Sequence, residues 1–230
     1  MSEPTKQAMT PAERLNQYIA EDRIIRGTWT GRDIMGRETA CLLAAFAEGM
    51  DSPEKCPATI MPPWLAYLTP SFDDHGSIEK WPNMIRRYGA LALKWHRLGD
   101  DAWNRCLAKT MIAVLEIARP YDRSRSCELV IELWKREYNG NFVQQSDWEE
   151  AAHAAWAAAR SAEVARAAAR SAKAAEGAAA WAPRAAAWAA AWAARSAAAA
   201  WDEITNACLD AIEDEISKSQ AETAMDEATE

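Results

Sequence analysis

Between Ala151 and Ala200 most residues are alanine, and large aromatic rings interrupt the alanine at intervals. Alanine has the highest helix propensity of the natural residues, so a stretch of this kind forms helix readily. One methyl group contributes only on the order of 1 kcal/mol on burial, so an alanine helix packs weakly by itself. A tryptophan ring buries roughly 150–250 Å². The sequence therefore predicts long helices that a few tryptophans hold against their neighbours.

The alanine-rich segment is predicted to be an antiparallel helical hairpin. Ser146 and Glu149 have the spacing of a capping box, and no Gly or Pro follows until Gly177, so we expect a helix of about 30 residues. Gly177 suits a helix end and Pro183 suits the first turn of the next helix, which places the bend at 177–182. A continuous helix kinked at the proline is the alternative.

Residues 1–145 have the apolar spacing of a helical bundle. Apolar residues recur at steps of four and three over 84–98 and again over 103–118, which is typical of an amphipathic helix packed on others. A further helix is expected around 129–134, after the turn at Pro120. Helices joined by short links favour an antiparallel arrangement.

The N-terminal quarter is predicted to hold two helices and a loop. Thr10, Pro11 and Glu13 form a helix start with a capping box, and this helix is expected to end before Gly27. Residues 27–36 are predicted to be a loop. Residues 38–48 are predicted to be a second helix with its apolar residues turned inward.

Six prolines fall within residues 51–82. Each proline removes an amide donor and restricts the residue before it, so we expect short turns and one-turn helices here. The segment also contains Trp64, Leu65 and Phe72, which makes it too apolar for a free linker. We expect this proline-rich excursion to pack across the neighbouring helices.

Together these patterns predict an all-α protein. Its expected parts are an N-terminal helical bundle over 1–145 that includes the proline-rich excursion, an Ala/Trp-rich helical hairpin over 146–217, and an acidic disordered tail over 218–230.

The formal net charge of −8 is unevenly distributed. Residues 151–200 carry six Lys/Arg against two Asp/Glu, and residues 201–230 carry one against ten. A chain of this charge is a poor general binder of nucleic acid unless its basic segment acts separately. The chain start lacks a basic region followed by an apolar run, and residues 185–194 are too short to span a bilayer. We expect a protein of the host-cell cytoplasm that has no membrane partner.

No metal or cofactor site is predicted. The five cysteines form an odd set without a Cys-x-x-Cys pair, and the three histidines match no zinc-binding pattern. The densest polar cluster is Asp73-Asp74-His75, which has the residue types for acid–base catalysis. The same residues followed by Gly76 are also ordinary turn chemistry, and we favour the turn. We therefore expect no catalytic residue and a protein that is not an enzyme.

A tryptophan stripe is the candidate partner-binding site. Trp181, Trp188 and Trp192 are spaced by seven and four, which places them on one helix face, and Arg184 and Arg195 flank them. Trp201 begins another stripe, with Ile204, Cys208 and Ile212, about half a turn away from the first. Packing within the chain is the ordinary role of such stripes. Because Trp and Arg are enriched at interface hot spots, we consider the first stripe a contact for a protein partner or a second copy of the chain.

A basic face is the candidate nucleic-acid site. Arg160 precedes Arg166, Arg170 and Lys173, which lie on one face of the first alanine-rich helix and have the charge to follow a phosphate backbone. A solvated face, or one paired with the acidic end of the chain, is the simpler interpretation.

Two segments resemble known groups of proteins. GRETACLLAA at 36–45 and MPPWLAYLTP at 61–70, with Asp73-Asp74 after them, resemble uncharacterised bacteriophage and prophage proteins. The alanine-rich stretch that begins with AAHAAWAAARSA at 151–162 is similar to immunity proteins of the Imm-5-like kind. The resemblance implies a mobile-element context, in which small helical proteins bind and block a host or rival protein.

We therefore expect a non-enzymatic binding protein that inhibits or escorts another macromolecule, for example a host-defence component. A nucleic-acid-associated phage protein that uses the basic face is one alternative. An enzyme centred on Asp73, Asp74 and His75 is the other.

Overall fold

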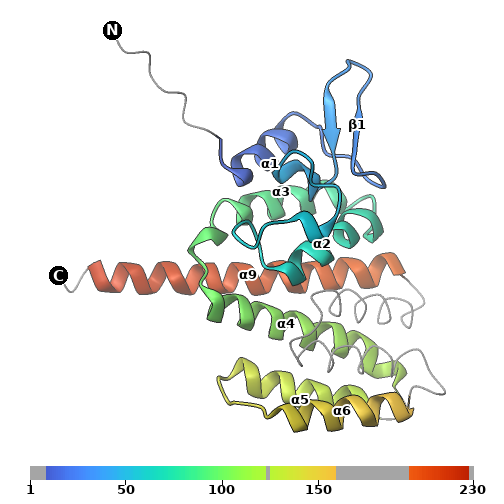
Figure 1. The fold of residues 1–230 in the computed structure, drawn as a ribbon, viewed down its shortest axis with the longest axis vertical. Helices are drawn as coiled ribbons and strands as arrows, with labels where there is room; N and C mark the ends of the chain where they lie inside the picture. Colours follow the sequence, from blue (N-terminus) through green and yellow to red (C-terminus); the bar gives the residue numbers. More distant parts are fainter. Residues whose placement is uncertain (1–8, 123–124, 159–196, 228–230) are drawn as a thin grey trace.

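The computed structural model describes residues 9–122, 125–158 and 197–227 (Figure 1). The all-α prediction is confirmed, since seven α-helices in these ranges account for most of the structure and the sheet has two three-residue strands. The helices are α1 Pro11–Ala20, α2 Pro63–His75, α3 Trp81–Ala92, α4 Asp100–Ala118, α5 Ser126–Tyr138, α6 Gln145–Ala158 and α9 Ala197–Glu227. The strands are β1 Thr30–Arg32 and β2 Glu38–Ala40, and short 3-10 turns cover Ala44–Phe46, Pro53–Lys55, Trp95–Arg97 and Arg119–Tyr121.

The predicted start of α1 is present in detail. The Thr10 hydroxyl accepts a hydrogen bond from the Glu13 amide, and the Glu13 carboxylate accepts one from the Thr10 amide. The helix ends at Ala20, earlier than predicted, because Asp22 adopts a left-handed backbone conformation and Ile24 then pairs with the strand residue Ala40.

The helix predicted over 38–48 is wrong. Residues 38–40 form β2, which pairs antiparallel with β1 in the register Thr30↔Ala40, Gly31↔Thr39 and Arg32↔Glu38. Only a 3-10 turn follows, at Ala44–Phe46. The prediction relied on the helical spacing of the apolar residues over 42–46, and these side chains are indeed buried. Strand pairing with residues 30–32, within the predicted loop, decided the backbone conformation.

The proline-rich excursion contains a 13-residue helix where only one-turn helices were predicted. Pro63 occupies the first helical position of α2, where a missing amide proton costs no hydrogen bond, and Pro70 lies inside the helix. The burial of Met61, Leu65 and Phe72 confirms that the segment packs across its neighbours. The gain from that burial outweighs the hydrogen bond that Pro70 removes.

Helix α9 runs through the middle of the molecule (Figure 1). It packs against α2 and α3 on one side and against α4 on the other, while α5 packs on α4 and α6 packs on α5. The buried apolar residues form one cluster that extends from Leu15 to Ile216. The described ends of the predicted hairpin, α6 and α9, lie on opposite sides of α4 (Figure 1), so each is part of the common core. The predicted bend at 177–182 lies outside the described residues.

The acidic end of the chain is helical and paired with the N-terminal half. Helix α9 extends to Glu227, whereas a disordered tail was predicted from residue 218; the residues there include good helix formers and no Gly or Pro. The buried Glu215 carboxylate accepts hydrogen bonds from Arg105 Nε at 2.8 Å and Lys218 Nζ at 2.7 Å. Burial acts to raise the pKa of Glu215, but these hydrogen bonds outweigh it and hold the pKa below its usual value. None of the helices in the described ranges has the length and apolar character needed to cross a bilayer.

We predict that α9 unfolds together with the N-terminal half. Ile212→Ala removes a fully buried side chain of α9 and should lower the free energy of unfolding by about 2–5 kcal/mol, in a single urea transition followed by both circular dichroism and tryptophan fluorescence. The exposed-site control Gln220→Ala should change it by less than about 0.5 kcal/mol. Two separate transitions, with only one of them affected by Ile212→Ala, would show that α9 belongs to an independent unit.

Candidate functional site

The two sites predicted on the alanine-rich helices lie outside the described residues. These are the partner stripe Trp181, Arg184, Trp188, Trp192 and Arg195, and the basic face Arg160, Arg166, Arg170 and Lys173. The second stripe is described. Trp201, Ile204, Cys208 and Ile212 are all fully buried on α9, which shows that this stripe packs within the chain.

The Asp73-Asp74-His75 cluster forms the last turn of α2, whereas a turn outside a helix was predicted. Asp73 is fully buried, and its oxygens accept hydrogen bonds from the Leu42 amide at 3.0 Å and the Trp81 indole N–H at 2.7 Å. Asp74 Oδ1 accepts one from the Gly27 amide at 2.7 Å. These carboxylates therefore connect α2 to the residues on either side of the hairpin and to α3.

The rest of the cluster also has a packing role. The His75 ring lies 5.7 Å from the Trp201 ring, between the end of α2 and the start of α9. In the part of the chain that the structure describes, no three His, Cys, Asp or Glu side chains come together in a way that could hold a metal ion. The geometry of Asp73, Asp74 and His75 is thus that of a junction between elements.

A small cavity of about 210 Å³ lies beside this junction, between α3 and α9 and closed at one end by the α2–α3 turn. Its lining combines apolar, amide and charged side chains: Phe72, Gly76, Ser77, Lys80, Trp81, Asn83, Met84, Arg87, Asp202, Thr205 and Asn206. The sequence analysis did not identify this cavity. Its residues come from three separate elements, and no spacing along the chain indicates that they meet.

Asp202 holds the start of α9 against the α2–α3 turn. Its carboxylate accepts hydrogen bonds from the Ser77 amide and the Ser77 hydroxyl, both at 2.8 Å, and pairs with Lys80 Nζ at 3.1 Å. Burial acts to raise the pKa of Asp202, but the Ser77 hydrogen bonds and Lys80 outweigh it and lower the pKa. There is no room for a side chain at residue 76, because a Cβ on Gly76 would lie 2.9 Å from Asp202 Oδ1.

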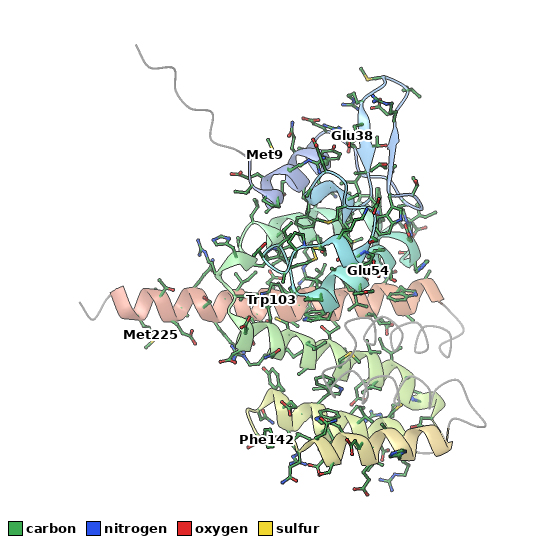
Figure 2. All side chains as sticks on the ribbon, viewed as in Figure 1. Met9, Glu38, Glu54, Trp103, Phe142 and Met225 are labelled. Carbon is green, nitrogen blue, oxygen red and sulfur yellow. The ribbon has the colours of Figure 1, made fainter. Side chains whose placement is uncertain are left out.

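A second hollow, of about 880 Å³, lies between α4 and the α5–α6 connection. Figure 2 shows Phe142 at the outer edge of this connection, and its ring is largely exposed. Trp134 and Trp148 line the same hollow but are buried against each other, with ring centroids 5.0 Å apart. These tryptophans therefore contribute to the core, and Phe142 stands apart from them on the surface.

The β1–β2 hairpin extends away from the helices (Figure 1), and Figure 2 shows the side chains at its tip projecting from the rest of the molecule. Ile34 at its tip is fully exposed and Met35 is 75% exposed. The loop that carries them is ordered by Asp33, whose Oδ1 accepts hydrogen bonds from the Met35 and Arg37 amides, both at 2.9 Å. Asp33 Oδ2 also accepts one from Arg37 Nε at 2.7 Å. The sequence prediction of a plain loop over 27–36 missed this projection.

Comparison of the chain with protein-family models, curated proteins and solved structures gave no match. The functional argument therefore depends on the chemistry of the described residues.

We predict that Asp73 makes stability depend on pH. Burial raises its pKa from the ordinary 3.8 to about 6, so the folded state favours the protonated form. The resulting stabilisation is complete below about pH 4 and is lost as the pH rises through about 6, a change of about 3 kcal/mol. Asp73→Asn cannot titrate, so urea unfolding between about pH 4 and pH 7 should show a flatter profile for this variant than for the parent protein. Parallel profiles of the two proteins would contradict this assignment.

Proposed function

We propose that the protein is a non-enzymatic binding protein that inhibits or escorts another protein, and that it docks through the tip of the β1–β2 hairpin. The observation that supports this most is the exposure of two large apolar side chains, Ile34 and Met35, on a projecting and ordered loop. When a partner covers exposed apolar surface, the hydrophobic effect contributes about 25 cal/mol of free energy per Å² of buried area. A loop already held in one conformation loses less entropy on binding.

Hydrogen bonds between residues close in the sequence order the tip of the β1–β2 hairpin. Asp33 N–H donates to the Arg37 carbonyl at 3.0 Å, and Gly36 N–H donates to the Asp33 carbonyl at 2.9 Å. Gly36 has a φ of +76°, a conformation that other residues rarely adopt. The pKa of Asp33 is lowered, since hydrogen bonds from the Arg37 side chain and from the amides of Arg37 and Met35 outweigh desolvation. The carboxylate form that orders the loop is therefore the one present at neutral pH.

The charge of the tip indicates the kind of partner. Arg32 and Arg37 flank the apolar pair, and Asp33 is the one acidic residue between them, so residues 32–37 carry a net charge of +1 in a chain of −8. Arg37 pairs with Asp33, while Arg32 Nη1 donates to the Gly36 carbonyl. Arg32 lies opposite Glu38 in the strand register but makes no ion pair with an acidic side chain among the described residues. The complementary surface is an apolar pocket with an acidic rim.

The hydrogen bonds of Asp73 and Asp74 also favour a binding protein over an enzyme. Both oxygens of Asp73 and one oxygen of Asp74 accept hydrogen bonds from N–H groups of the chain itself, which is the arrangement of structural carboxylates. In the mobile-element context that the resemblance implies, the proposed partner is a host or rival protein such as a defence component.

We predict that the double substitution Ile34→Asp/Met35→Asp weakens partner binding roughly 30-fold or more, because it places charges where apolar surface is buried. The immobilised protein would be used to isolate host proteins, and a purified candidate would then be titrated by calorimetry. The control is Ile78→Asp, which makes one substitution of the same kind at an 80% exposed isoleucine outside the hairpin and should leave the affinity unchanged. Circular dichroism would verify that all variants are folded.

The same assay separates the hairpin from the other proposed contact, the stripe of Trp181, Trp188 and Trp192. A partner that the hairpin variant still binds at full affinity, but that Trp188→Ala/Trp192→Ala loses, would assign docking to that stripe. If a partner binds both variants as tightly as it binds the parent protein, neither surface is its docking site.

A further inference from the structure

We infer that the protein binds a second copy of itself, with the tip of the β1–β2 hairpin of one copy docked in the hollow between α4 and the α5–α6 connection of another. This inference rests on the proposed function in one respect, since it uses the same tip as the docking element. It adds a surface that the tip fits and a state of the protein in which the tip is covered.

The hollow presents an exposed aromatic ring on an ordered loop. The Phe142 ring is 82% exposed, whereas every other phenylalanine and tryptophan side chain that the structure describes is buried or half-buried (Figure 2). The Phe142 carbonyl accepts a hydrogen bond from Arg136 Nη2 at 3.4 Å. The next residue, Val143, is buried and donates its amide to Glu137 Oε1 at 3.3 Å. The ring is therefore held at the surface by a fixed backbone, so covering it costs little ordering of the loop.

The charge of the hollow is complementary to that of the tip. Asp101 of α4 and Glu137 of α5 line the hollow, and both are exposed. Neither makes an ion pair within the part of the chain that the structure describes. The one cation of the lining, Arg105, pairs with the buried Glu215 at 2.7 Å. The arginines that flank the apolar tip would thus meet two carboxylates beside an apolar ring, which is the surface that the charge of the tip calls for.

The hollow also has room for the tip. Its volume is about 880 Å³, and the side chains of Ile34 and Met35 fill only part of that space, so the loop that carries them can enter as well. Leu107 and Tyr138 line the hollow beside Phe142 and are half-buried. The two apolar side chains of the tip would therefore contact apolar surface from both α4 and α5.

The position of the two surfaces requires two copies of the chain. The hairpin and the α5–α6 connection lie at opposite ends of the long axis of the molecule (Figure 1), so a tip does not reach the hollow of its own chain. The contact joins two different surfaces. It closes into a symmetric pair if each copy docks its tip in the other, and otherwise it continues from head to tail. In both arrangements, self-docking covers the tip that would bind a host protein.

Self-docking through one small tip is expected to be weak and reversible. A loop of this size buries less surface than the roughly 1,200–2,000 Å² of a stable interface, so we expect a dissociation constant on the order of 100 µM. The tip would be free in dilute protein and covered in concentrated protein. A host protein that binds the tip more tightly would displace the second copy.

The test is sedimentation velocity of the full chain from about 10 µM to about 1 mM, at about 150 mM salt to screen the repulsion between chains of net charge −8. The parent protein should associate. The tip variant Ile34→Asp/Met35→Asp and the hollow variant Phe142→Asp should each associate about tenfold more weakly or less, because each places a charge in the apolar contact. The control Leu129→Asp makes a substitution like Phe142→Asp at an exposed leucine of α5 outside the hollow and should associate like the parent protein.

A mixture of the two variants tests the contact directly. The tip variant keeps an intact hollow and the hollow variant keeps an intact tip, so an equal mixture should form pairs that neither variant forms alone. Circular dichroism would verify that both variants are folded. The inference is overturned if the parent protein stays monomeric up to about 1 mM, if Phe142→Asp associates as tightly as the parent or no more weakly than Leu129→Asp, or if the mixture does not associate.

Binding of the host protein separates this inference from the proposed function. Phe142→Asp should bind the host protein at least as tightly as the parent protein does, because its tip is no longer covered, whereas the tip variant should lose both contacts. A parent protein that stays monomeric but binds the host protein through the tip overturns self-docking alone. If self-docking occurs and the tip variant still binds the host protein, the proposed docking site is wrong and self-docking stands.

Discussion

Helix α9 completes the core that the first half of the chain begins. Its buried stripe from Trp201 to Ile216 packs between α3 and α4, two helices that lie about a hundred residues earlier in the sequence. The carboxylates beside that stripe meet cations of the same helices, with Asp214 at 2.7 Å from Lys109 and Glu215 at 2.7 Å from Arg105. Apolar burial and charge pairing thus select the same position for α9, and α2, α3 and α4 all pack directly on it.

The surfaces discussed above follow from this arrangement. Because Asp202 at the start of α9 binds Ser77, the α2–α3 turn is held over the end of α9 and a cavity remains between the helices. Because Asp73 and Asp74 bind residues on both sides of the hairpin, the base of the hairpin is fixed to α2 while its tip extends into solvent. The two acidic side chains that were catalytic candidates in the sequence therefore position the surface at which docking is proposed.

Trp148 and Trp201 have the role that the alanine-rich composition implies, which is to hold helices of small side chains against their neighbours. Trp148 of α6 packs on Trp134 of α5, and Trp201 of α9 lies against His75 of α2. If the two arms of the predicted hairpin packed on each other, tryptophan rings within residues 146–217 would contact one another. The rings of Trp148 and Trp201 instead pack on the N-terminal helices, where larger side chains offer more contact than alanine methyl groups do.

Local sequence by itself determined where several helices begin and which faces they bury. The Thr10–Glu13 capping box, the apolar spacing of α4 and α5 and the stripe on α9 all have periodicities or hydrogen bonds that span one or two helical turns, so they can be recognised from neighbouring residues. The tertiary structure alone decided that residues 38–40 form a strand, that α2 continues through Pro70, and that Asp202 of α9 meets Ser77 of the α2–α3 turn. These outcomes depend on contacts between residues that are distant in the chain, where the burial of large side chains and the pairing of charges outweigh local preferences of about 1 kcal/mol per residue.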